Sequence, residues 1–344
     1  MKILIDIGHP AHVHFFRNAI SLWRQAGDEV LITSRDKDVT LRLLEEYGLA
    51  HRCLSRSRST RWSLGIELLV REYQLFWLAR RFRPDVMSAI AGTFMVHVGR
   101  LLRIPTVVFY DTEHAHLQNS ITYPFADYIC TPTAYQGDLG PKHVRYAGYH
   151  ELAYLHPARF TPDPAVLKDH GLKEGEKYFI VRFISWAASH DCGLRGFSED
   201  GKRRLVQLLS SAGRVIITSE KALPAEFEPY RLAVSPTRIH DLMAYAFLYI
   251  GEGATMASEA AMLGSPSIFV NTVRAGTIDE QAHKYGLVKQ LVEDDSIISE
   301  VQALLGAPDI RAEYQARRRR MLAEKVDVTA WQMKFLRDVA DKSK

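Results

Sequence analysis

Two groups of residues in this sequence have the types and the spacing that could do chemistry. The larger group is the stretch 251–271, in which Gly251-Glu252-Gly253 ends an apolar run and a helix-like run to Leu263 follows. Glycines in such a turn let backbone N–H groups approach a ligand, and the start of a helix adds unpaired donors and the positive end of its dipole. A phosphate suits that environment. Glu259 shares a helix face with Thr255, so it could hold ribose hydroxyls one turn below the phosphate.

The same stretch also has a purely structural interpretation. A buried helix whose single glutamate, Glu259, pairs with a core arginine would leave the same pattern, because charged side chains are seldom buried without a partner. In either case Gly264 and Pro266 should end the helix, and 267–270 should form a strand. The stretch therefore predicts a strand, a tight turn, a helix and a second strand.

Histidines and carboxylates form the second group. His9, His12 and His14 follow the apolar run 2–7, and a further set follows the apolar run 106–110: Asp111, Glu113, His114 and His116. In an open parallel sheet, ligands bind at the carboxyl ends of the strands. Several groups that accept or release protons could therefore converge at one edge, where a histidine near neutrality or a carboxylate with a raised pKa can act as a general base.

Two other interpretations of the histidines stay open. The pattern H-x-x-H-x-H with a nearby carboxylate is chemically able to bind a metal, although its spacing matches no closed structural site. The histidines could instead cap the following helix and fill the turn. We expect no metal requirement, since nothing in the sequence demands one.

The composition is that of an ordinary globular protein. The chain has 344 residues, of which 47% are hydrophobic and 24% charged, and a formal net charge of +4. Such a charge does not by itself indicate nucleic-acid binding. The three cysteines form no C-x-x-C pair, which disfavours a disulfide framework and a zinc site. We see no signal peptide and no apolar run near the ~20 residues that span a membrane, so we expect a cytoplasmic protein.

The elements that must position these residues alternate between strands and helices from the first residue onward. This alternation favours doubly wound parallel sheets, and the length favours two domains. The segment 148–164 contains three prolines and no clean period, which marks it as an interdomain linker. We predict α/β domains at 1–152 and 153–344 that face each other across a cleft, with the last helix able to pack back on the first domain.

Two segments carry a resemblance to known enzymes. Arg238-Ile239-His240-Asp241-Leu242-Met243, followed by Gly253-Ala254-Thr255, Glu259, Gly264-Ser265-Pro266 and Gln281, is similar in order and spacing to the donor-binding segment of nucleotide-sugar enzymes of the glycosyltransferase-B fold. Gly8-His9-Pro10-Ala11-His12-Val13-His14-Phe15 resembles their first-strand loop. The comparison is to the N-acetylglucosaminyltransferase of peptidoglycan synthesis, to nucleotide-sugar 2-epimerases, and to an uncharacterised family with Asp-x-Glu-His and Glu-Gly-Ala-Thr-Met-Ala-Ser-Glu motifs.

The resemblance implies two Rossmann-like domains and a role for each matched residue. In the second domain, Ile239 would lie near a uracil-like base, Glu259 on the ribose, Gln281 on the donor sugar, and Gly253, Ala254 and Thr255 on the diphosphate. Apart from the resemblance, Arg182 could help to stabilise the departing diphosphate. In the first domain, His12 would lie in the cleft beside the loop residues Gly8, His9 and His14. The sequence departs from the glycine-rich loops of those enzymes at 9–11 and at 184–190.

By this resemblance the chain is a glycosyltransferase that uses a uridine diphosphate sugar in surface polysaccharide or glycolipid synthesis. The base would be His12 or Glu113, with Asp111 orienting an imidazole and His114 beside them. One alternative is a nucleotide-sugar 2-epimerase, which could use Asp111, Glu113 and His114 around the sugar. Another alternative is a non-catalytic protein that binds nucleotide sugars. No cofactor other than the donor substrate is expected.

The expected partners are the nucleotide sugar and a glycan or lipid-linked acceptor. The segment 56–83 carries seven arginines among aromatic residues, so its helix could lie on an anionic membrane surface at the inner face. It could also be an ordinary packed helix with arginines on its solvated face. We expect no nucleic acid as a partner, since no recognisable binding module surrounds the basic residues.

Overall fold

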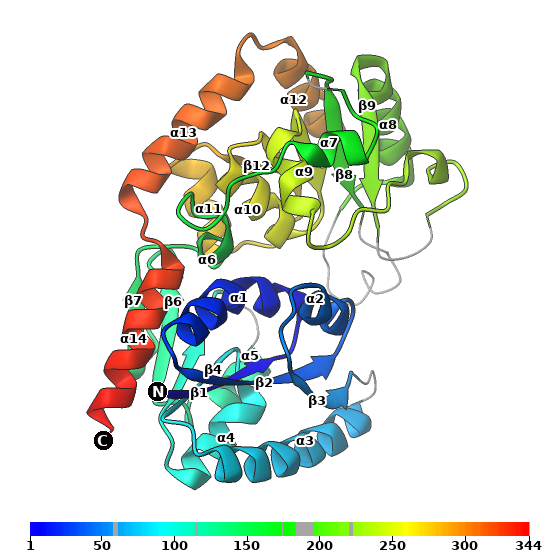
Figure 1. Cartoon of the computed structure of the whole chain (residues 1–344). Helices are drawn as coiled ribbons and strands as arrows, with labels where there is room; N and C mark the ends of the chain where they lie inside the picture. Colours follow the sequence, from blue (N-terminus) through cyan, green and yellow to red (C-terminus); the bar gives the residue numbers. More distant parts are fainter. Residues whose placement is uncertain (58–60, 114–115, 174, 184–195, 220–222, 344) are drawn as a thin grey trace. The chain divides into compact units, whose positions relative to one another are not determined.

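The computed structural model describes residues 1–57, 61–113, 116–173, 175–183, 196–219 and 223–343. The chain forms two compact units (Figure 1). Unit 1 contains Met1–Arg159 and Lys325–Lys344, and unit 2 contains Phe160–Glu324. Each unit is built on one parallel sheet with helices on its faces, so the predicted fold class is confirmed. The predicted boundary lay at residue 152, whereas unit 1 continues to Arg159 and also includes the C-terminal helix.

Unit 1 has a seven-stranded sheet in the order β3-β2-β1-β4-β5-β6-β7. Its elements are β1 (Lys2–Ile7), α1 (Pro10–Gln25), β2 (Glu29–Asp36), α2 (Thr40–Glu46), β3 (Arg52–Arg56), α3 (Arg61–Phe82), β4 (Val86–Ile90), α4 (Thr93–Leu102), β5 (Thr106–Phe109), α5 (His116–Thr122), β6 (Tyr128–Pro132), β7 (His143–Tyr146), α6 (Leu152–Leu155) and α14 (Val328–Lys342). The strand order reverses between β1 and β4, and ligands of open α/β sheets bind at such a reversal.

Unit 2 has a five-stranded sheet in the order β12-β11-β10-β8-β9. Its elements are α7 (Ala165–Asp169), β8 (Tyr178–Arg182), α8 (Glu199–Ala212), β9 (Arg214–Thr218), α9 (Ile239–Tyr245), β10 (Leu248–Gly251), α10 (Ala254–Leu263), β11 (Ser267–Val270), α11 (Gly276–His283), β12 (Val288–Leu291), α12 (Asp294–Gly306) and α13 (Ile310–Glu324). Here the reversal lies between β8 and β10.

The predicted strand–turn–helix–strand stretch is confirmed as β10, α10 and β11. Gly264 ends α10 with a φ of 74°, a left-handed conformation that residues with a side chain rarely adopt. A Cβ at this position would also lie 2.6 Å from the Nε2 atom of Gln315. The left-handed turn therefore favours glycine here, and a larger residue would also have to displace the end of the Gln315 side chain.

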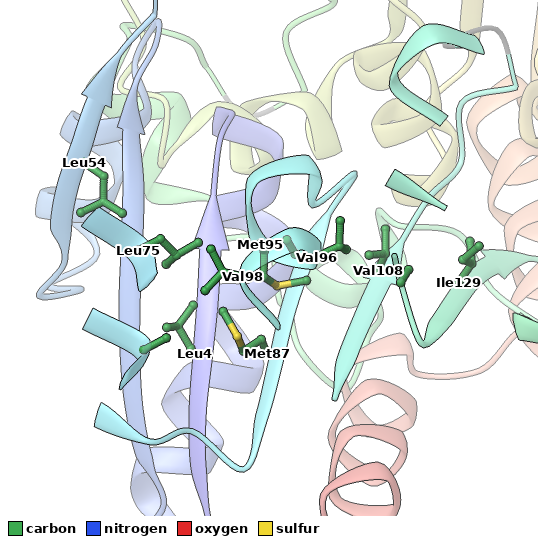
Figure 2. Packing of buried hydrophobic residues seen from close by; sticks show 12 residues of the cluster. Leu4, Leu54, Leu75, Met87, Met95, Val96, Val98, Val108 and Ile129 are labelled. Carbon is green, nitrogen blue, oxygen red and sulfur yellow. The ribbon is translucent and has the colours of Figure 1, made fainter. Parts of the chain in front are cut away.

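One face of the unit 1 sheet is covered by α3 and α4 (Figure 1). The core beneath them joins Leu4 of β1, Met87 of β4 and Val108 of β5 with Leu75 of α3 and Met95 of α4 (Figure 2). The inner face of α3 is thus committed to the sheet. The helix expected within the segment 56–83 is confirmed as α3.

The prediction of an interdomain linker at 148–164 is wrong for the first part of that segment. Residues Leu152–Leu155 form α6, and all four are buried in unit 1. The C-terminal helix α14 packs beside α6, where the Thr329 hydroxyl donates to the Ala153 carbonyl oxygen at 2.6 Å. A helix of one turn has too few residues to show a period, and the nearby prolines hid it.

Candidate functional site

The first candidate site lies in unit 1 at the carboxyl end of β1, where the strand order reverses. His9 caps α1, since its Nδ1 atom accepts a hydrogen bond from the Ala11 N–H at 3.2 Å. Pro10 occupies the first helical position, which needs no N–H donor. The capping interpretation of the histidines therefore holds for His9. Its side chain is still 44% exposed, so a ligand can also reach it.

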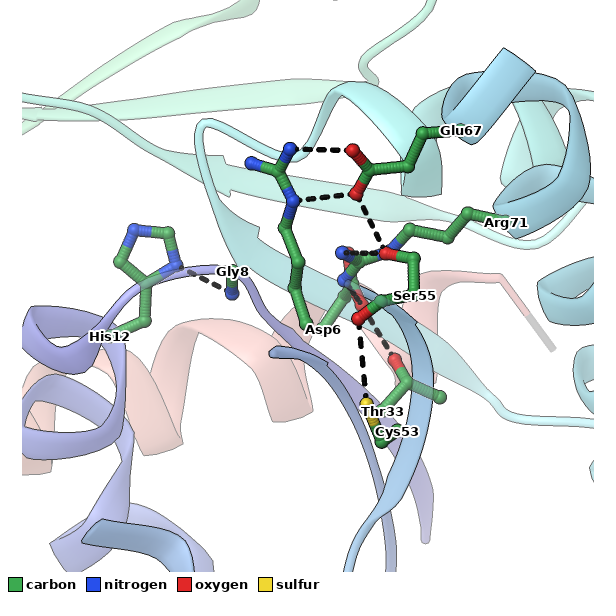
Figure 3. Close-up of polar contacts among 9 residues, drawn as sticks. Asp6, Gly8, His12, Thr33, Cys53, Ser55, Glu67 and Arg71 are labelled. Carbon is green, nitrogen blue, oxygen red and sulfur yellow. Dashed lines mark hydrogen bonds and ion pairs between the residues drawn. The ribbon is translucent and has the colours of Figure 1, made fainter. Parts of the chain in front are cut away.

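His12 lies in the first turn of α1 and is partly exposed. The Gly8 N–H donates to its Nδ1 atom at 3.2 Å (Figure 3). Burial lowers the pKa of His12 well below 6.5, and His9 and His150 lower it further, against an opposing effect of Asp111. The ring is therefore neutral near pH 7. Because Nδ1 accepts a hydrogen bond, the proton of the neutral ring lies on Nε2.

Asp111 follows β5 and orients an imidazole, but that imidazole belongs to His150. The Asp111 Oδ2 atom lies 3.1 Å from the His150 Nδ1 atom. Burial alone would raise the pKa of Asp111, yet His150 and Thr112 lower it overall. Burial alone would also lower the pKa of His150, but Asp111 and Glu151 raise it overall. The pair thus favours a carboxylate and an imidazolium.

The two members of this pair differ in exposure. The Asp111 side chain is 32% exposed and the His150 side chain 9%. The ring of His150 lies between Phe15, at 4.7 Å, and Tyr146, stacked at 6.4 Å between ring centroids. The His150 Nε2 atom is buried and has no hydrogen-bond partner in the part of the chain that the structure describes. Asp111 is therefore the group that a ligand reaches, and His150 positions it.

Two other predicted residues of unit 1 have contacts of their own. His14 is buried on α1 and its ring lies 5.2 Å from that of Tyr154. Glu113 accepts a hydrogen bond from the Gln136 N–H at 3.2 Å. His114 lies outside the described residues. His150 was missed because the segment containing it was taken for a linker; recognising β7 as a strand would have drawn attention to the residues that follow its carboxyl end.

The second candidate site lies in unit 2, where the strand order reverses between β8 and β10. Arg182 ends β8 and pairs in register with Gly251, which ends β10. A Cβ on Gly251 would lie 2.3 Å from the Tyr249 hydroxyl oxygen and 3.2 Å from the Arg182 Cβ atom. The glycine therefore lets the two strand ends approach closely, and Arg182 is partly exposed.

The start of α10 is uncapped. Gly253 is its N-cap in an extended conformation with φ −98° and ψ 124°, and no side chain among the described residues caps this end. Ala254 is partly exposed and Thr255 exposed. The first N–H groups of a helix have no intrahelical acceptor. An anion at this point would meet those donors and the positive end of the helix dipole.

Glu259 is 5% exposed and its Oε1 atom lies 2.9 Å from the Nε2 atom of His240. The buried-pair interpretation thus describes the structure, with a histidine of α9 in place of an arginine. A ribose contact by Glu259 stays a prediction, and a ribose hydroxyl there has to compete with His240 for the carboxylate. His240 lies in the run that resembles the donor-binding segment, although the resemblance gave it no role.

The two remaining donor-site residues differ in accessibility. Ile239 begins α9 and is partly exposed. Gln281 is fully buried, and its Nε2 atom donates to the Ser258 hydroxyl at 2.8 Å. The Gln281 Oε1 atom is buried and has no hydrogen-bond partner in the described part of the chain. A contact between Gln281 and a sugar stays a prediction and requires the side chain to become reachable.

The described residues show neither a metal cluster nor a membrane-spanning helix. No group of three or more histidine, cysteine, aspartate or glutamate side chains there could hold a metal ion. Among these same residues, no helix has both the length and the apolar character that crossing a membrane requires.

The chain matches a protein family over most of its length. The family model described as "Protein of unknown function (DUF354)" matches residues 1–324. The uncharacterized protein MJ0665 of Methanocaldococcus jannaschii is 25% identical over 284 residues, which cover 78% of this chain and 81% of that protein.

Two solved structures share the fold. UDP-GlcNAc 2-epimerase from Neisseria meningitidis bound to UDP-GlcNAc has a TM-score of 0.68 at 12% identity, over 91% of this chain and 94% of that one. Spinosyn rhamnosyltransferase complexed with thymidine diphosphate has a TM-score of 0.62 at 15% identity, over 97% of this chain and 100% of that one. At these identities the likeness shows the glycosyltransferase-B fold, and the resemblance seen in the sequence is confirmed at that level.

Proposed function

The chain belongs to the family described as protein of unknown function DUF354, and we propose that it is a glycosyltransferase that moves a sugar from a nucleotide donor to an acceptor hydroxyl. The donor is of the uridine diphosphate type, and the acceptor is a glycan or a lipid-linked glycan of surface polysaccharide or glycolipid synthesis. The observation that carries the proposal is the uncapped start of α10 at the strand-order reversal of unit 2.

In this proposal unit 2 binds the donor. The diphosphate accepts hydrogen bonds from the N–H groups of Ala254 and Thr255, and Arg182 neutralises part of its charge. Ile239 packs on the base, Glu259 accepts from the ribose hydroxyls, and Gln281 contacts the sugar. Two proteins of the same fold, both distant in sequence, carry UDP-GlcNAc and thymidine diphosphate in their solved structures.

Unit 1 would bind the acceptor and supply the base. The acceptor oxygen attacks the anomeric carbon of the donor sugar, its proton passes to His12, and the bond to the departing diphosphate breaks. Neutral His12 is ready to accept, and the ionised Asp111 stabilises the imidazolium that forms. Acceptance at Nε2 requires the ring proton to lie on Nδ1, so the Gly8 hydrogen bond is given up, which costs on the order of 1 kcal/mol. The positive end of the α10 dipole stabilises the negative charge on the departing diphosphate.

A nucleotide-sugar 2-epimerase remains the second candidate, favoured by the Asp111–His150 pair at the edge of unit 1. Epimerisation at a sugar carbon needs proton-transfer groups but no acceptor. The two activities are distinguished by incubating the protein with a nucleotide sugar alone. Conversion of the sugar to its 2-epimer without an acceptor would support the epimerase and contradict the transferase.

The donor site is tested with Ala254→Pro. Proline is favoured at the first helical position, and the extended Gly253 before it is compatible with a following proline, so α10 should still form. The substitution removes one N–H donor. Because hydrogen bonds to charged groups contribute about 1.5–3 kcal/mol, we expect uridine diphosphate to bind at least about tenfold more weakly, measured by calorimetry.

Ala254→Ser is the matched control, since it keeps the N–H group and should bind the nucleotide as the wild type does. If the proline and serine variants bind the nucleotide with equal affinity, the start of α10 does not bind the diphosphate. If wild-type protein binds no uridine or thymidine nucleotide, the proposed function is wrong.

A further inference from the structure

The outer face of α3 is apolar along most of its described length. Its exposed apolar side chains are Ile66 (56%), Leu69 (69%), Val70 (47%), Tyr73 (66%) and Trp77 (52%). They recur at spacings of three and four residues, so they form one stripe along the helix, which we call the α3 apolar face. Gln74 is the exposed polar residue among them. A helix that faces water normally carries charged residues at such positions.

The neighbouring helices extend this surface. Leu101 of α4 is 71% exposed. A crevice of about 350 Å³ between α3 and α4 is lined by Trp77, Leu101 and His97, among others. The ring of Phe125, which is 40% exposed, packs edge-on against His97 at 4.6 Å. Contiguous exposed apolar surface of this kind marks an interaction site.

Charge around the α3 apolar face is mainly positive. Arg80 and Arg81 continue the stripe beyond Trp77, and both are exposed. The helices α3 and α4 each follow a strand of one parallel sheet, so their C-terminal ends lie at the same edge. The exposed arginines at that edge are Arg80, Arg81, Arg83, Arg100 and Arg103.

Acidic side chains offset only part of this positive charge. Glu29 and Asp85 line a crevice together with Arg80, Arg81 and Arg83, and each has a partner in Lys2, whose Nζ atom lies 3.4 Å from Glu29 and whose N–H donates to Asp85. Glu67 is buried and accepts two hydrogen bonds from Arg35. The Glu72 Oε1 atom lies 2.5 Å from the His97 Nδ1 atom. On the described part of α3 and α4, no exposed carboxylate therefore remains.

We propose that the α3 apolar face binds an anionic lipid surface, with α3 lying in the plane of the interface. Tyr73 and Trp77 would enter the boundary between headgroups and acyl chains, where aromatic side chains with a polar edge are favoured. The arginines at the C-terminal ends of α3 and α4 would contact lipid phosphates. This inference does not depend on the sugar chemistry, because all of these residues lie in unit 1 and none belongs to either candidate site.

A second copy of the chain fits this face less well. Two-fold packing places the same surface on both partners. Each copy offers exposed arginines and no exposed carboxylate on the described part of these helices, and the arginines outnumber Glu29 and Asp85 beside them, so mainly positive surfaces would meet. An anionic membrane supplies the missing negative charge. Charge complementarity thus selects the lipid surface.

The test is sedimentation of the full chain with vesicles of phosphatidylcholine alone and of phosphatidylcholine mixed with phosphatidylglycerol. Wild type should bind the mixed vesicles, bind phosphatidylcholine weakly, and dissociate as salt rises. Tyr73→Ser with Trp77→Ser should weaken binding at least about tenfold, since apolar area is lost from the interface. Arg80→Ser with Arg81→Ser should remove most of the preference for anionic vesicles.

The matched controls replace one apolar residue and one arginine that lie outside the α3 apolar face. Val326→Ser replaces another exposed apolar side chain of unit 1, and Arg42→Ser replaces an exposed arginine of α2. Both should bind vesicles as the wild type does. Circular dichroism checks that every variant folds, which the exposure of the replaced side chains leads us to expect.

Two results would overturn the inference. One is wild-type protein that binds neither type of vesicle. The other is a dimer in sedimentation velocity that Tyr73→Ser with Trp77→Ser converts to a monomer, which would assign the face to a second copy. Nucleotide binding is read separately by calorimetry, so a failure here leaves the donor-site experiment unaffected.

Discussion

Asp111 and His150 show at the residue scale how a buried pair tunes the site. Their charges stabilise each other and outweigh the burial that opposes each charged form. His150 is buried, so we expect it to hold the partly exposed Asp111 carboxylate in place and ionised. Asp111 in turn stabilises a proton on His12.

The pair makes stability depend on pH. The pKa of His150 is raised above 6.5, so its contribution is fully present below pH 6.5 and is lost as pH rises through the raised value. The pKa of Asp111 is lowered below 3.8, so its contribution is present above pH 3.8 and is lost as pH falls through the lowered value. We expect His150→Gln to abolish the alkaline loss, measured as the melting temperature across pH.

A catalytic readout separates positioning from folding. In His150→Gln the pKa of Asp111 should rise, because the imidazolium that lowers it is gone. The acidic limb of the kcat/KM–pH profile, measured with any donor and acceptor the enzyme accepts, should then move to higher pH. His14→Gln is a suitable control, since His14 is also buried on unit 1 but packs against Tyr154. An unchanged acidic limb would contradict the positioning role.

At the scale of elements, α3 is tied to the sheet by a buried polar network (Figure 3). Arg71 is fully buried and its Nη2 atom donates to the Asp6 Oδ1 atom of β1 at 2.6 Å. Glu67 accepts from Arg35 of β2 and, at 2.8 Å, from the Ser55 hydroxyl of β3. Each buried charge therefore has a partner, and together with the core the network holds the α3 apolar face outward.

Breaking this network should unfold unit 1 more readily. Arg71→Met leaves the Asp6 carboxylate buried without its cation, which typically costs about 3–5 kcal/mol. The exposed pair Arg42–Glu46 is the control, because Arg42→Met should cost about 0.5 kcal/mol or less. Urea denaturation measures both free energies of unfolding. Equal effects of the two substitutions would contradict the importance of the network.

At the scale of the whole molecule, the C-terminal helix α14 completes unit 1, which otherwise consists of the first part of the chain. The Gln332 Nε2 atom of α14 donates to the Phe15 carbonyl oxygen of α1 at 3.2 Å, and the Arg337 Nη2 atom donates to Asp28 at 2.7 Å. The Trp331 ring lies 4.8 Å from that of Tyr146, which itself stacks on His150. The last helix thus supports the wall of the candidate site.

Removal of residues 325–344 should therefore destabilise unit 1. The lost contacts include the fully buried Leu336, whose replacement by alanine alone is expected to cost about 2–5 kcal/mol. We expect the truncated chain to be insoluble or to melt well below the wild type in differential scanning fluorimetry. A chain that ends after Lys342 keeps all of α14 and should melt as the wild type does.

The sequence by itself determined the local elements and the edges where chemistry could occur. Hydrophobic runs predicted the strands, and Gly264 with Pro266 predicted the end of α10, because these signals depend on residues close together in the chain. The rule that ligands lie at carboxyl ends of strands selected Asp111, His12 and the start of α10. The roles of these residues in catalysis and binding stay predictions.

Only the tertiary structure decided which side chains meet. Asp111 pairs with His150, and Glu259 pairs with His240, across separations that no local pattern records. Burial likewise hid His14 and Gln281 and left Trp77 exposed on a helix whose sequence alone fits both a solvated and a membrane-bound face. The physical reason is that partner choice and burial are set by long-range packing, whereas propensity and periodicity report only on neighbours in the chain.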